Sequence, residues 1–360
     1  MMLENYSHHM LKEIFEEPEV LRNTIKLERD RLRELSSKII SEDYDMIYIT
    51  GSGTSYHAGL ASQYALSNLA KIIASTLPAS EFHQWIPSEI SRKILLMAIS
   101  QSGESSDVIR AADVALQRGI KLLAVTNTSD STLAKKADFC IFPRSGKELA
   151  IPATKTYVAQ LMAMYMFSVS LALERGKNHD ISEMEERLYE APRIVEYALE
   201  SLKSKVQETA DKFKDKNAVF LLGSGPNYVT ALEGALKLKE TCKIFSEGFA
   251  TREFLHGPIR LVDEETIVVM IASPDEVEDT VKLSRSLKRF GASVILISEK
   301  SHKVEQLVND VDEAFLLPEG IPQPFSPLPY VLPLQLFAYY TSVYKGLNPD
   351  KPEKLTKVVR

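Results

Sequence analysis

The chain has 360 residues, of which 44% are hydrophobic and 26% are charged, and its formal net charge at pH 7 is −6. This length allows about two domains, and the acidic balance argues against a nucleic-acid-binding surface, which would show a basic patch. No apolar run approaches the ~18 residues of a membrane span. Residues 1–21 contain several Glu and His and no apolar signal core.

The cysteine content gives an expectation about compartment and metal binding. Cys140 and Cys242 are the only cysteines, and the sequence has no CxxC motif and no His/Cys cluster. We therefore expect a reduced, cytoplasmic protein that needs neither zinc nor another cofactor. Position 2 is Met, so no N-terminal Cys is available as a nucleophile.

Strands and helices alternate in the first half of the sequence. Residues 10–37 have apolar side chains at helical spacing, with Pro18 as a break or a helix start. Buried strands are predicted at 46–50, 94–100, 122–127 and 139–143. Helices are predicted at 57–69, after residue 107 to 118, shortly after 132, and at 154–173. This alternation predicts an α/β fold in which helices cover both faces of a parallel sheet.

The second half repeats this pattern after a charged, helical connector at 176–216. Strands are predicted at 218–225, 267–274, 293–298 and 314–318, and a helix follows the Gly-Ser-Gly turn at 223–225. The segment 346–360 is rich in Pro and Lys and has no helical period. It is either disordered or pinned across an active site.

Three landmarks recur in register between the halves, which indicates an internal repeat. Gly223 follows Gly51 by 172 residues, Gly291 follows Gly119 by 172, and Ser273 follows Ser100 by 173. We therefore predict two tandem αβα domains of flavodoxin-like type at 37–175 and 217–345. A helical segment at 1–36, the connector and the tail at 346–360 complete the chain.

The two copies differ at the loop after their second predicted strand. The first copy has a run of hydroxyls around Gly103, joined by Thr54 and Ser55 from the preceding loop, and a helix start follows it. Such a loop suits a phosphate, although serine-rich loops also serve as plain helix caps. The second copy has Pro274 and two carboxylates there, which make a poor anion site.

A candidate acid–base group lies in the second copy. Glu233, Lys237 and Glu240 occur at i, i+4 and i+7 on the helix after residue 225, so they share one face, and His256 follows in a Leu-His-Gly-Pro turn. A carboxylate and an imidazole near a glycine-rich turn are groups that move protons on a small polar substrate. The alternative is a solvated ion-pair face and an ordinary turn histidine.

Four motifs make the chain resemble the double sugar-isomerase (SIS) family. They are GSGTSYHAG, ISQSGESSD, ALEGALKLKE with FLHGP, and the closing DKPEKLTK. This family includes the isomerase half of glutamine–fructose-6-phosphate aminotransferases (glucosamine-6-phosphate synthases) and stand-alone glucosamine-6-phosphate deaminases. The likeness covers nearly the whole chain.

The resemblance implies roles for particular residues. The sugar phosphate would be held by side chains of the two first-copy loops, namely Thr54, Ser55, Ser100, Gln101, Ser102 and Ser105. Glu240 would carry a proton between C1 and C2, with Lys237 on the same face. His256, contributed by the neighbouring subunit of a homodimer, would help open the ring, and Lys357 would meet the open-chain carbonyl. The loop that closes on the sugar would include Glu148, Ile151 and Ala153.

The sequence also departs from the synthase pattern. The glutaminase part is missing, so we expect no transfer of ammonia from glutamine by this chain alone. Ser224 stands where Arg is common, and Val358 to Arg360 replace the synthase ending. The implied activity interconverts glucosamine 6-phosphate with fructose 6-phosphate and ammonia, in a direction that the sequence does not fix. The alternatives are a fructosamine-6-phosphate deglycase, a non-catalytic sugar-phosphate sensor and a scaffold subunit. No nucleic-acid or membrane partner is expected.

Overall fold

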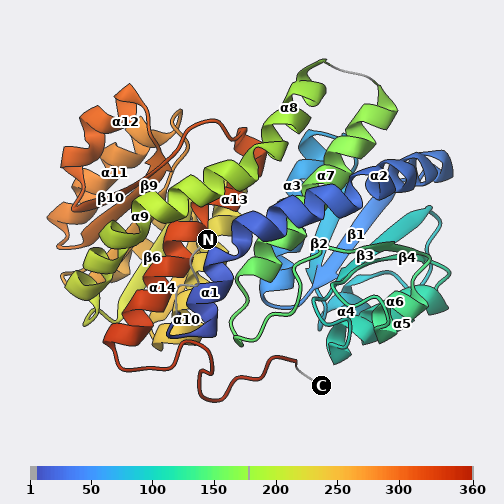
Figure 1. Ribbon diagram of the computed structural model, residues 1–360, viewed down its shortest axis with the longest axis horizontal. Coiled ribbons are helices and arrows are strands. Elements are labelled where there is room, and N and C mark those ends of the chain that lie inside the picture. The colour runs from blue at the N-terminus through green and yellow to red at the C-terminus, as the bar shows by residue number, and fades with distance from the viewer. Residues whose placement is uncertain (1–5, 177–178, 359–360) are drawn as a thin grey trace. The chain divides into compact units, whose positions relative to one another are not determined.

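The computed structural model describes residues 6–176 and 179–358 and groups them into two compact units, each with its own five-stranded parallel sheet (Figure 1). The first-sheet unit comprises the described residues of 17–148, 155–192 and 356–360. The second-sheet unit comprises those of 1–16, 149–154 and 193–355. The described parts of the predicted segments 1–36, 176–216 and 346–360 are each divided between the units. Residues 1–5 and 359–360 of the predicted terminal segments lie outside the described residues.

The first sheet contains the four predicted strands and one more, in the order β2-β1-β3-β4-β5. Its strands are β1 (Met46–Gly51), β2 (Ala74–Pro78), β3 (Ile94–Ile99), β4 (Lys121–Val125) and β5 (Phe139–Ile141). All pairs are parallel, as predicted. Alternate side chains of one strand face opposite helices: Ile99 approaches Gly59 of α3, whereas Leu96 and Ala98 pack with Val108 of α5.

Helices surround this sheet. They are α2 (Glu17–Glu42), α3 (Thr54–Asn68), α4 (Phe82–Trp85), α5 (Ser106–Gln117), α6 (Thr132–Lys136), α7 (Lys155–Arg175) and α8 (His179–Tyr189). The helical pattern at 10–37 divides into α1 (His9–Phe15) and α2, and Pro18 is the second residue of α2, where its missing N–H costs nothing. The helix start predicted at Pro18 is therefore confirmed.

The helix α7 corrects the expectation that no segment is apolar enough to span a membrane. By length and composition Lys155–Arg175 could do so. However, 94% of its most apolar 18-residue window is buried inside the protein. In the first-sheet unit α7 packs along α2 and α3, so it is a core helix that is buried on every side.

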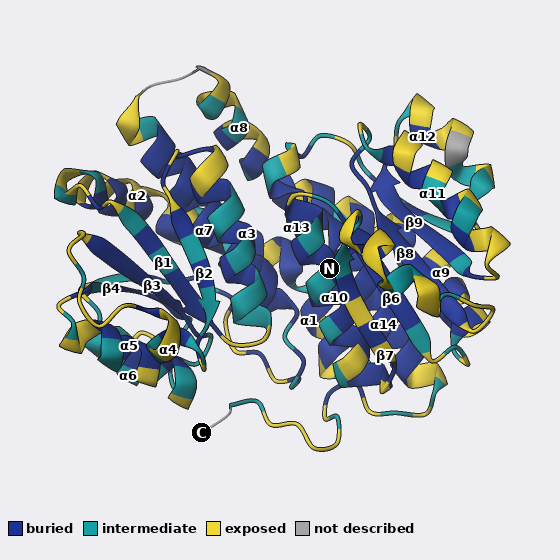
Figure 2. Ribbon diagram, turned by 180° about the vertical axis from the view of Figure 1, so that it is seen from behind, coloured by how far each residue is buried: buried dark blue, intermediate teal, exposed yellow. Residues whose placement is uncertain are grey.

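The second sheet has the order β10-β9-β8-β6-β7, which is the order of the first sheet with each strand replaced by its repeat partner. Its strands are β6 (Ala218–Gly223), β7 (Phe245–Ala250), β8 (Thr266–Ile271), β9 (Ser293–Glu299) and β10 (Glu313–Leu317). All four pairs are parallel. The central strands β3 and β8 are buried at every position and are dark blue in Figure 2, whereas the edge strands β2 and β7 are only partly buried.

One face of the second sheet packs against α11 and α12, and the other packs against α10 and α14. The helices are α1, α9 (Ala191–Phe213), α10 (Pro226–Cys242), α11 (Val277–Arg289), α12 (His302–Leu307), α13 (Pro327–Tyr330) and α14 (Leu332–Tyr344). Short 3₁₀ turns lie at Glu253–His256, Pro258–Leu261, Val308–Asp310 and Gln323–Phe325. The tail after α14 forms no helix or strand through residue 358.

The repeat extends to single hydrogen bonds. Asp138 accepts the N–H of Leu122 at 2.9 Å, and its repeat partner Asp312 accepts the N–H of Val294 at 2.8 Å. The helix caps Gly53 and Gly225 have φ of 54° and 53°, a left-handed conformation that glycine adopts without strain. The two halves are thus copies of one unit.

Candidate active site

Two loops of the first-sheet unit lie where its strand order reverses. β1 and β3 are neighbours, but the chain leaves β1 toward β2 and leaves β3 toward β4, on opposite sides. Such a switch point opens a crevice at the carboxyl ends of the strands, where parallel sheets bind ligands. The loops that begin there carry the six predicted phosphate-binding residues, Thr54, Ser55, Ser100, Gln101, Ser102 and Ser105.

The loop after β3 is a tight turn shaped by its own serines. The buried Ser100 hydroxyl accepts the N–H of Gly103 at 3.1 Å, and the Ser102 hydroxyl accepts the N–H of Glu104 at 3.1 Å. Gly103 has φ of +67°, and a Cβ there would lie 2.1 Å from Ser131 Oγ, so only glycine fits. Each hydroxyl that accepts an N–H keeps its own hydrogen for an anion.

The carboxylate of Glu104, which lies in this loop, is occupied by hydrogen bonds from Thr132. The Glu104 carboxylate accepts the N–H of Thr132 at 2.8 Å and its hydroxyl at 2.9 Å, at the start of α6. Ser105 is the N-cap of α5, and its side chain makes no capping hydrogen bond. The first N–H groups of α5 have no helical acceptor, and the helix dipole favours an anion there. The loop can therefore hold a phosphate.

The loop after β1 adds further polar groups at the same switch point. Thr54 is the first residue of α3, directly after the N-cap Gly53. The Ser55 hydroxyl accepts a hydrogen bond at 3.1 Å from the amide of Gln160, which is buried in α7. Gln101, on the other loop, is half-buried and its carbonyl accepts the N–H of Asn127 at 3.1 Å.

In the second-sheet unit the corresponding loop is closed to anions. The Ser273 hydroxyl donates to the Glu276 carboxylate at 2.6 Å, and the Ser273 N–H donates to the same oxygen at 3.3 Å. The polar groups that would meet a phosphate are thus occupied by a carboxylate of the chain. This agrees with the difference between the copies that the sequence predicts.

The acid–base candidates of α10 form a triad in which Glu233 and Lys237 are buried and Glu240 is partly exposed. Lys237 is 0% exposed, and its Nζ lies 2.6 Å from Glu240 Oε2 and 3.3 Å from Glu233 Oε1. Burial alone would lower the pKa of Lys237, but attraction to Glu233 and Glu240 outweighs it and raises that pKa above its ordinary value. Lys237 therefore stays charged, and it fixes Glu240 rather than facing solvent.

Glu240 opens onto a cavity that the C-terminal tail helps to form. Its side chain is 21% exposed. The cavity has a volume of about 710 Å³, enough for a small ligand. It lies within the second-sheet unit, and its lining comes from the end of α10, including Leu236 and Lys243, and from tail residues between Gly346 and Leu355. The tail is thus ordered beside the candidate base.

The predicted closing loop and the end of the tail meet within the first-sheet unit. The buried Glu148 carboxylate accepts the N–H of Thr156 at 3.1 Å and lies 2.7 Å from Nζ of Lys357. Ile151 and Ala153, the other two predicted loop residues, belong to the second-sheet unit and are half-buried. The structure thus pairs Glu148 with Lys357.

His256 occupies a different environment from the other candidates. It ends the 3₁₀ turn Glu253–His256 of the second-sheet unit, and its side chain is exposed. Phe254 anchors this turn by packing against Phe220 and Phe249, at ring-centroid distances of 5.2 and 5.6 Å. Within residues 6–176 and 179–358, no hydrogen bond or ion pair involves the His256 ring.

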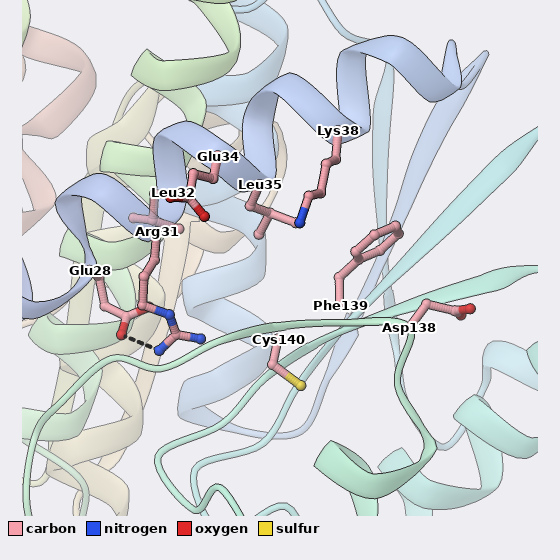
Figure 3. Close-up of a pocket in the computed structure, with 9 residues that line it drawn as sticks. All are labelled: Glu28, Arg31, Leu32, Glu34, Leu35, Lys38, Asp138, Phe139 and Cys140. Atoms are coloured by element: carbon pink, nitrogen blue, oxygen red, sulfur yellow. Dashed lines mark hydrogen bonds and ion pairs between the residues drawn. The ribbon is translucent and has the colours of Figure 1, made fainter.

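A second hollow, of about 290 Å³, lies between α2 and β5 of the first-sheet unit (Figure 3). Figure 3 shows Arg31 beside Glu28, whose side chain is 1% exposed and which also accepts from Nε of Arg144 at 2.7 Å. Arg144 and Arg31 both stack on Phe142, at 5.2 and 5.0 Å from its ring. This hollow contains no predicted site residue, but Glu28 anchors the segment that leads to Glu148.

Among the described residues, no group of three or more His, Cys, Asp and Glu could hold a metal ion. The candidate residues form two groups, each described within its own unit. The first-sheet unit contains the hydroxyl loops and the Glu148–Lys357 pair. The second-sheet unit contains Glu240, Lys237 and the cavity beside the tail.

A family model described as SIS domain matches residues 40–170 and 212–345, which include both sheets. A glutamine–fructose-6-phosphate aminotransferase [isomerizing] from Clostridium tetani (strain Massachusetts / E88) is 39% identical over 98% of this chain. The chain spans 59% of the length of that relative.

Two solved structures resemble the chain over nearly its whole length. The C-terminal domain of glucosamine-fructose-6-phosphate aminotransferase from Francisella tularensis matches with a TM-score of 0.88 and 30% identity, covering 98% of this chain and 100% of that one. Glucosamine-6-phosphate deaminase from Thermotoga maritima matches with a TM-score of 0.77 and 26% identity, covering 98% and 99%.

Proposed function

Because the chain belongs to the SIS domain family, we propose that it is a phosphosugar isomerase that interconverts glucosamine 6-phosphate with fructose 6-phosphate and ammonia. The observation that carries this proposal is the placement of Glu240, fixed by the buried Lys237 and open to a cavity that the ordered tail lines. The identity of the sugar in this proposal is taken from the names of the relatives from Clostridium tetani and Thermotoga maritima.

The chemistry needs one base and a few fixed hydrogen-bond donors. In the deaminating direction Glu240 takes the proton from C2 of the open-chain sugar and returns it to C1 through an enolamine. Water then attacks C2, the C–N bond breaks, and ammonia leaves with fructose 6-phosphate as the ketose product. One carboxylate can move the proton both ways, while the Lys357 ammonium stabilises the oxygen on C1.

The remaining residues have binding and ring-opening roles in this proposal. The hydroxyl loops of the first-sheet unit grip the phosphate, and Ile151 and Ala153 close on the sugar. His256 comes from the second subunit of a homodimer and assists ring opening. The protein works in the cytoplasm, without a metal or organic cofactor.

Two alternative functions differ from this proposal in the substrate or in the chemistry. A fructosamine-6-phosphate deglycase uses the same site on a larger conjugate, and the cavity of about 710 Å³ leaves room for one. A purely sensing protein would give no role to a base held by a buried lysine.

The test is to incubate the purified chain with glucosamine 6-phosphate and to measure ammonia and fructose 6-phosphate, and then to supply fructose 6-phosphate with ammonium and measure the reverse reaction. Equal amounts of ammonia and fructose 6-phosphate support the proposal. Fructose 6-phosphate binding without turnover in either direction would favour the sensor. Turnover of a fructosamine 6-phosphate but not of glucosamine 6-phosphate would favour the deglycase.

A further inference from the structure

The Glu13 carboxylate, which has no role in the proposed chemistry, and one backbone carbonyl of the tail hold the backbone of the closing loop in the second-sheet unit. The oxygens of Glu13 in α1 accept the N–H groups of Leu149 at 2.5 Å and Ala150 at 3.2 Å. The next N–H, of Ile151, donates to the carbonyl of Asp350 at 2.9 Å. Three consecutive loop N–H groups are thus held, two by α1 and one by the tail.

Asp350 also joins the tail to α1. Its two carboxylate oxygens accept the N–H groups of His9 at 2.8 Å and Met10 at 2.7 Å, the first two residues of α1. The N-cap of that helix, His8, makes no side-chain capping hydrogen bond, so Asp350 caps the helix from the other end of the sequence. In Figure 1, α1 lies beside α14, from which the tail departs.

The burial of Glu13 and Asp350 indicates that their carboxylates stabilise the backbone segments that they bind. Glu13 is 3% exposed and Asp350 is 9% exposed. A buried carboxylate is costly unless hydrogen bonds stabilise its charge, and backbone N–H groups do so here. The same chain segments meet again in the first-sheet unit, where Glu148 next to the loop pairs with Lys357 at the end of the tail.

We infer that Glu13 and Asp350 are positioning residues that couple the loop 148–154 to the tail 348–357, so that the two segments open and close together. The inference rests on the proposed function, in which Ile151 and Ala153 close on the sugar and Lys357 meets its carbonyl. A tail that leaves its place must release the N–H of Ile151 and the cap of α1. Release of the loop by Glu13 must in turn loosen the tail.

The test uses the full chain with Glu13→Gln, Asp350→Asn and the double substitution. The matched control is Asp312→Asn, which also weakens a carboxylate bound to a backbone N–H of the second-sheet unit, that of Val294 at 2.8 Å. The first measurement is the rate of trypsin cleavage after Lys354, which is exposed in the tail. Both single variants should be cut about tenfold faster than the wild type, because cleavage follows the open population, and the control should not.

The second measurement is steady-state kinetics with glucosamine 6-phosphate. Each single variant should lose about 10- to 100-fold in kcat/KM through misplacement of the loop and tail. The double variant should lose no more than the worse single variant, since both substitutions release the same element. Asn348→Ala provides a variant that spares the fold, because this exposed side chain accepts the N–H of Asp350 at 2.9 Å and only preorganises the tail.

The outcomes separate this inference from the proposed function. If Glu13→Gln leaves tail cleavage at the rate of the Asp312→Asn control, the loop and tail are not coupled and the inference is wrong. If the two losses in kcat/KM multiply, the carboxylates act independently, which also overturns it. If neither the wild type nor any variant turns over the sugar, the proposed function is wrong. The rate of trypsin cleavage still shows whether the loop and the tail are coupled.

Discussion

The ammonium of Lys237 lies 2.6 Å from the Glu240 carboxylate, and the two side chains differ sharply in exposure. Lys237 is wholly buried, while Glu240 keeps 21% of its side chain exposed. The lysine therefore lies in the interior of the second-sheet unit and the carboxylate lies at its cavity. Lys237 therefore holds the Glu240 carboxylate in one orientation before the substrate binds, so the carboxylate does not have to be oriented during the reaction.

The first prediction concerns the lysine. Lys237→Met should destabilise the fold by about 3–5 kcal/mol, because it leaves a buried carboxylate without its counter-charge. That carboxylate is Glu233, whose side chain is 0% exposed. Urea unfolding measures the loss. The control is Glu233→Gln with Lys237→Met, which should be more stable than Lys237→Met alone. A double variant that is less stable would contradict the pairing.

The second prediction concerns the base. Glu240→Gln should lower kcat by about 10²–10⁴-fold, the usual contribution of a general base, because an amide keeps the shape and cannot accept the proton. Binding of fructose 6-phosphate, measured by calorimetry, should persist. Lys239→Gln, an exposed neighbour that lines the same cavity, is the control and should retain activity. Undiminished turnover in Glu240→Gln would remove this carboxylate from the mechanism.

The strands that the sequence pattern located are those with continuous apolar runs. β3 and β8 are buried at every position and were predictable from their side chains. β2 and β7 were not, because they are edge strands whose sequences, ASTLP and FSEGFA, have no apolar run. The other two edge strands, β5 and β10, do have apolar runs and were predicted. An edge strand has a hydrogen-bonded neighbour on one side only and needs no long apolar run, so its pairing is a tertiary property.

The site shows a similar limit. Glu240 and Lys237 were recognisable, because helical spacing places them on one face. The sequence did not reveal the roles of Glu13 and Asp350, because each acts on backbone N–H groups more than 100 residues away. One signal was present: Glu13 interrupts the apolar face formed by Met10, Leu11 and Ile14, and a charge on a buried face requires partners.

The third prediction concerns Glu28, which binds Arg144 in the segment that leads to Glu148. Glu28→Gln should cost about 1.5–3 kcal/mol, the loss of hydrogen bonds to charged groups, because the buried carboxylate binds Arg31 and Arg144. It should also raise KM, since Arg144 begins the segment that leads to Glu148. Glu34→Gln, an exposed neighbour on α2 that lines the same hollow, should change neither. Equal effects of the two substitutions would refute the anchoring role.

The fourth prediction compares two truncations of the tail. Removing residues 356–360 deletes Lys357 and should lower kcat by about 10²-fold, as for the loss of an oxyanion donor, with little change in the unfolding midpoint. Removing residues 347–360 also deletes the cap that Asp350 places on α1, and should cost a further 1–3 kcal/mol or so. A stability loss that is the same for both truncations would show that Asp350 does not hold α1.

The fifth prediction tests whether His256 serves a second chain. In a homodimer with shared sites, one site combines Glu240 of one subunit with His256 of the other. Mixing inactive Glu240→Gln and His256→Ala chains, by unfolding and refolding them together, would give hybrids in which one of two sites is intact. The mixture should regain about a quarter of the wild-type activity, since half of the random dimers are hybrids. Activity that stays at the level of the separate variants would place both groups in one subunit. The imidazole is exposed on its Phe254-anchored turn, and none of residues 6–176 and 179–358 forms a hydrogen bond or ion pair with it, which favours the shared arrangement.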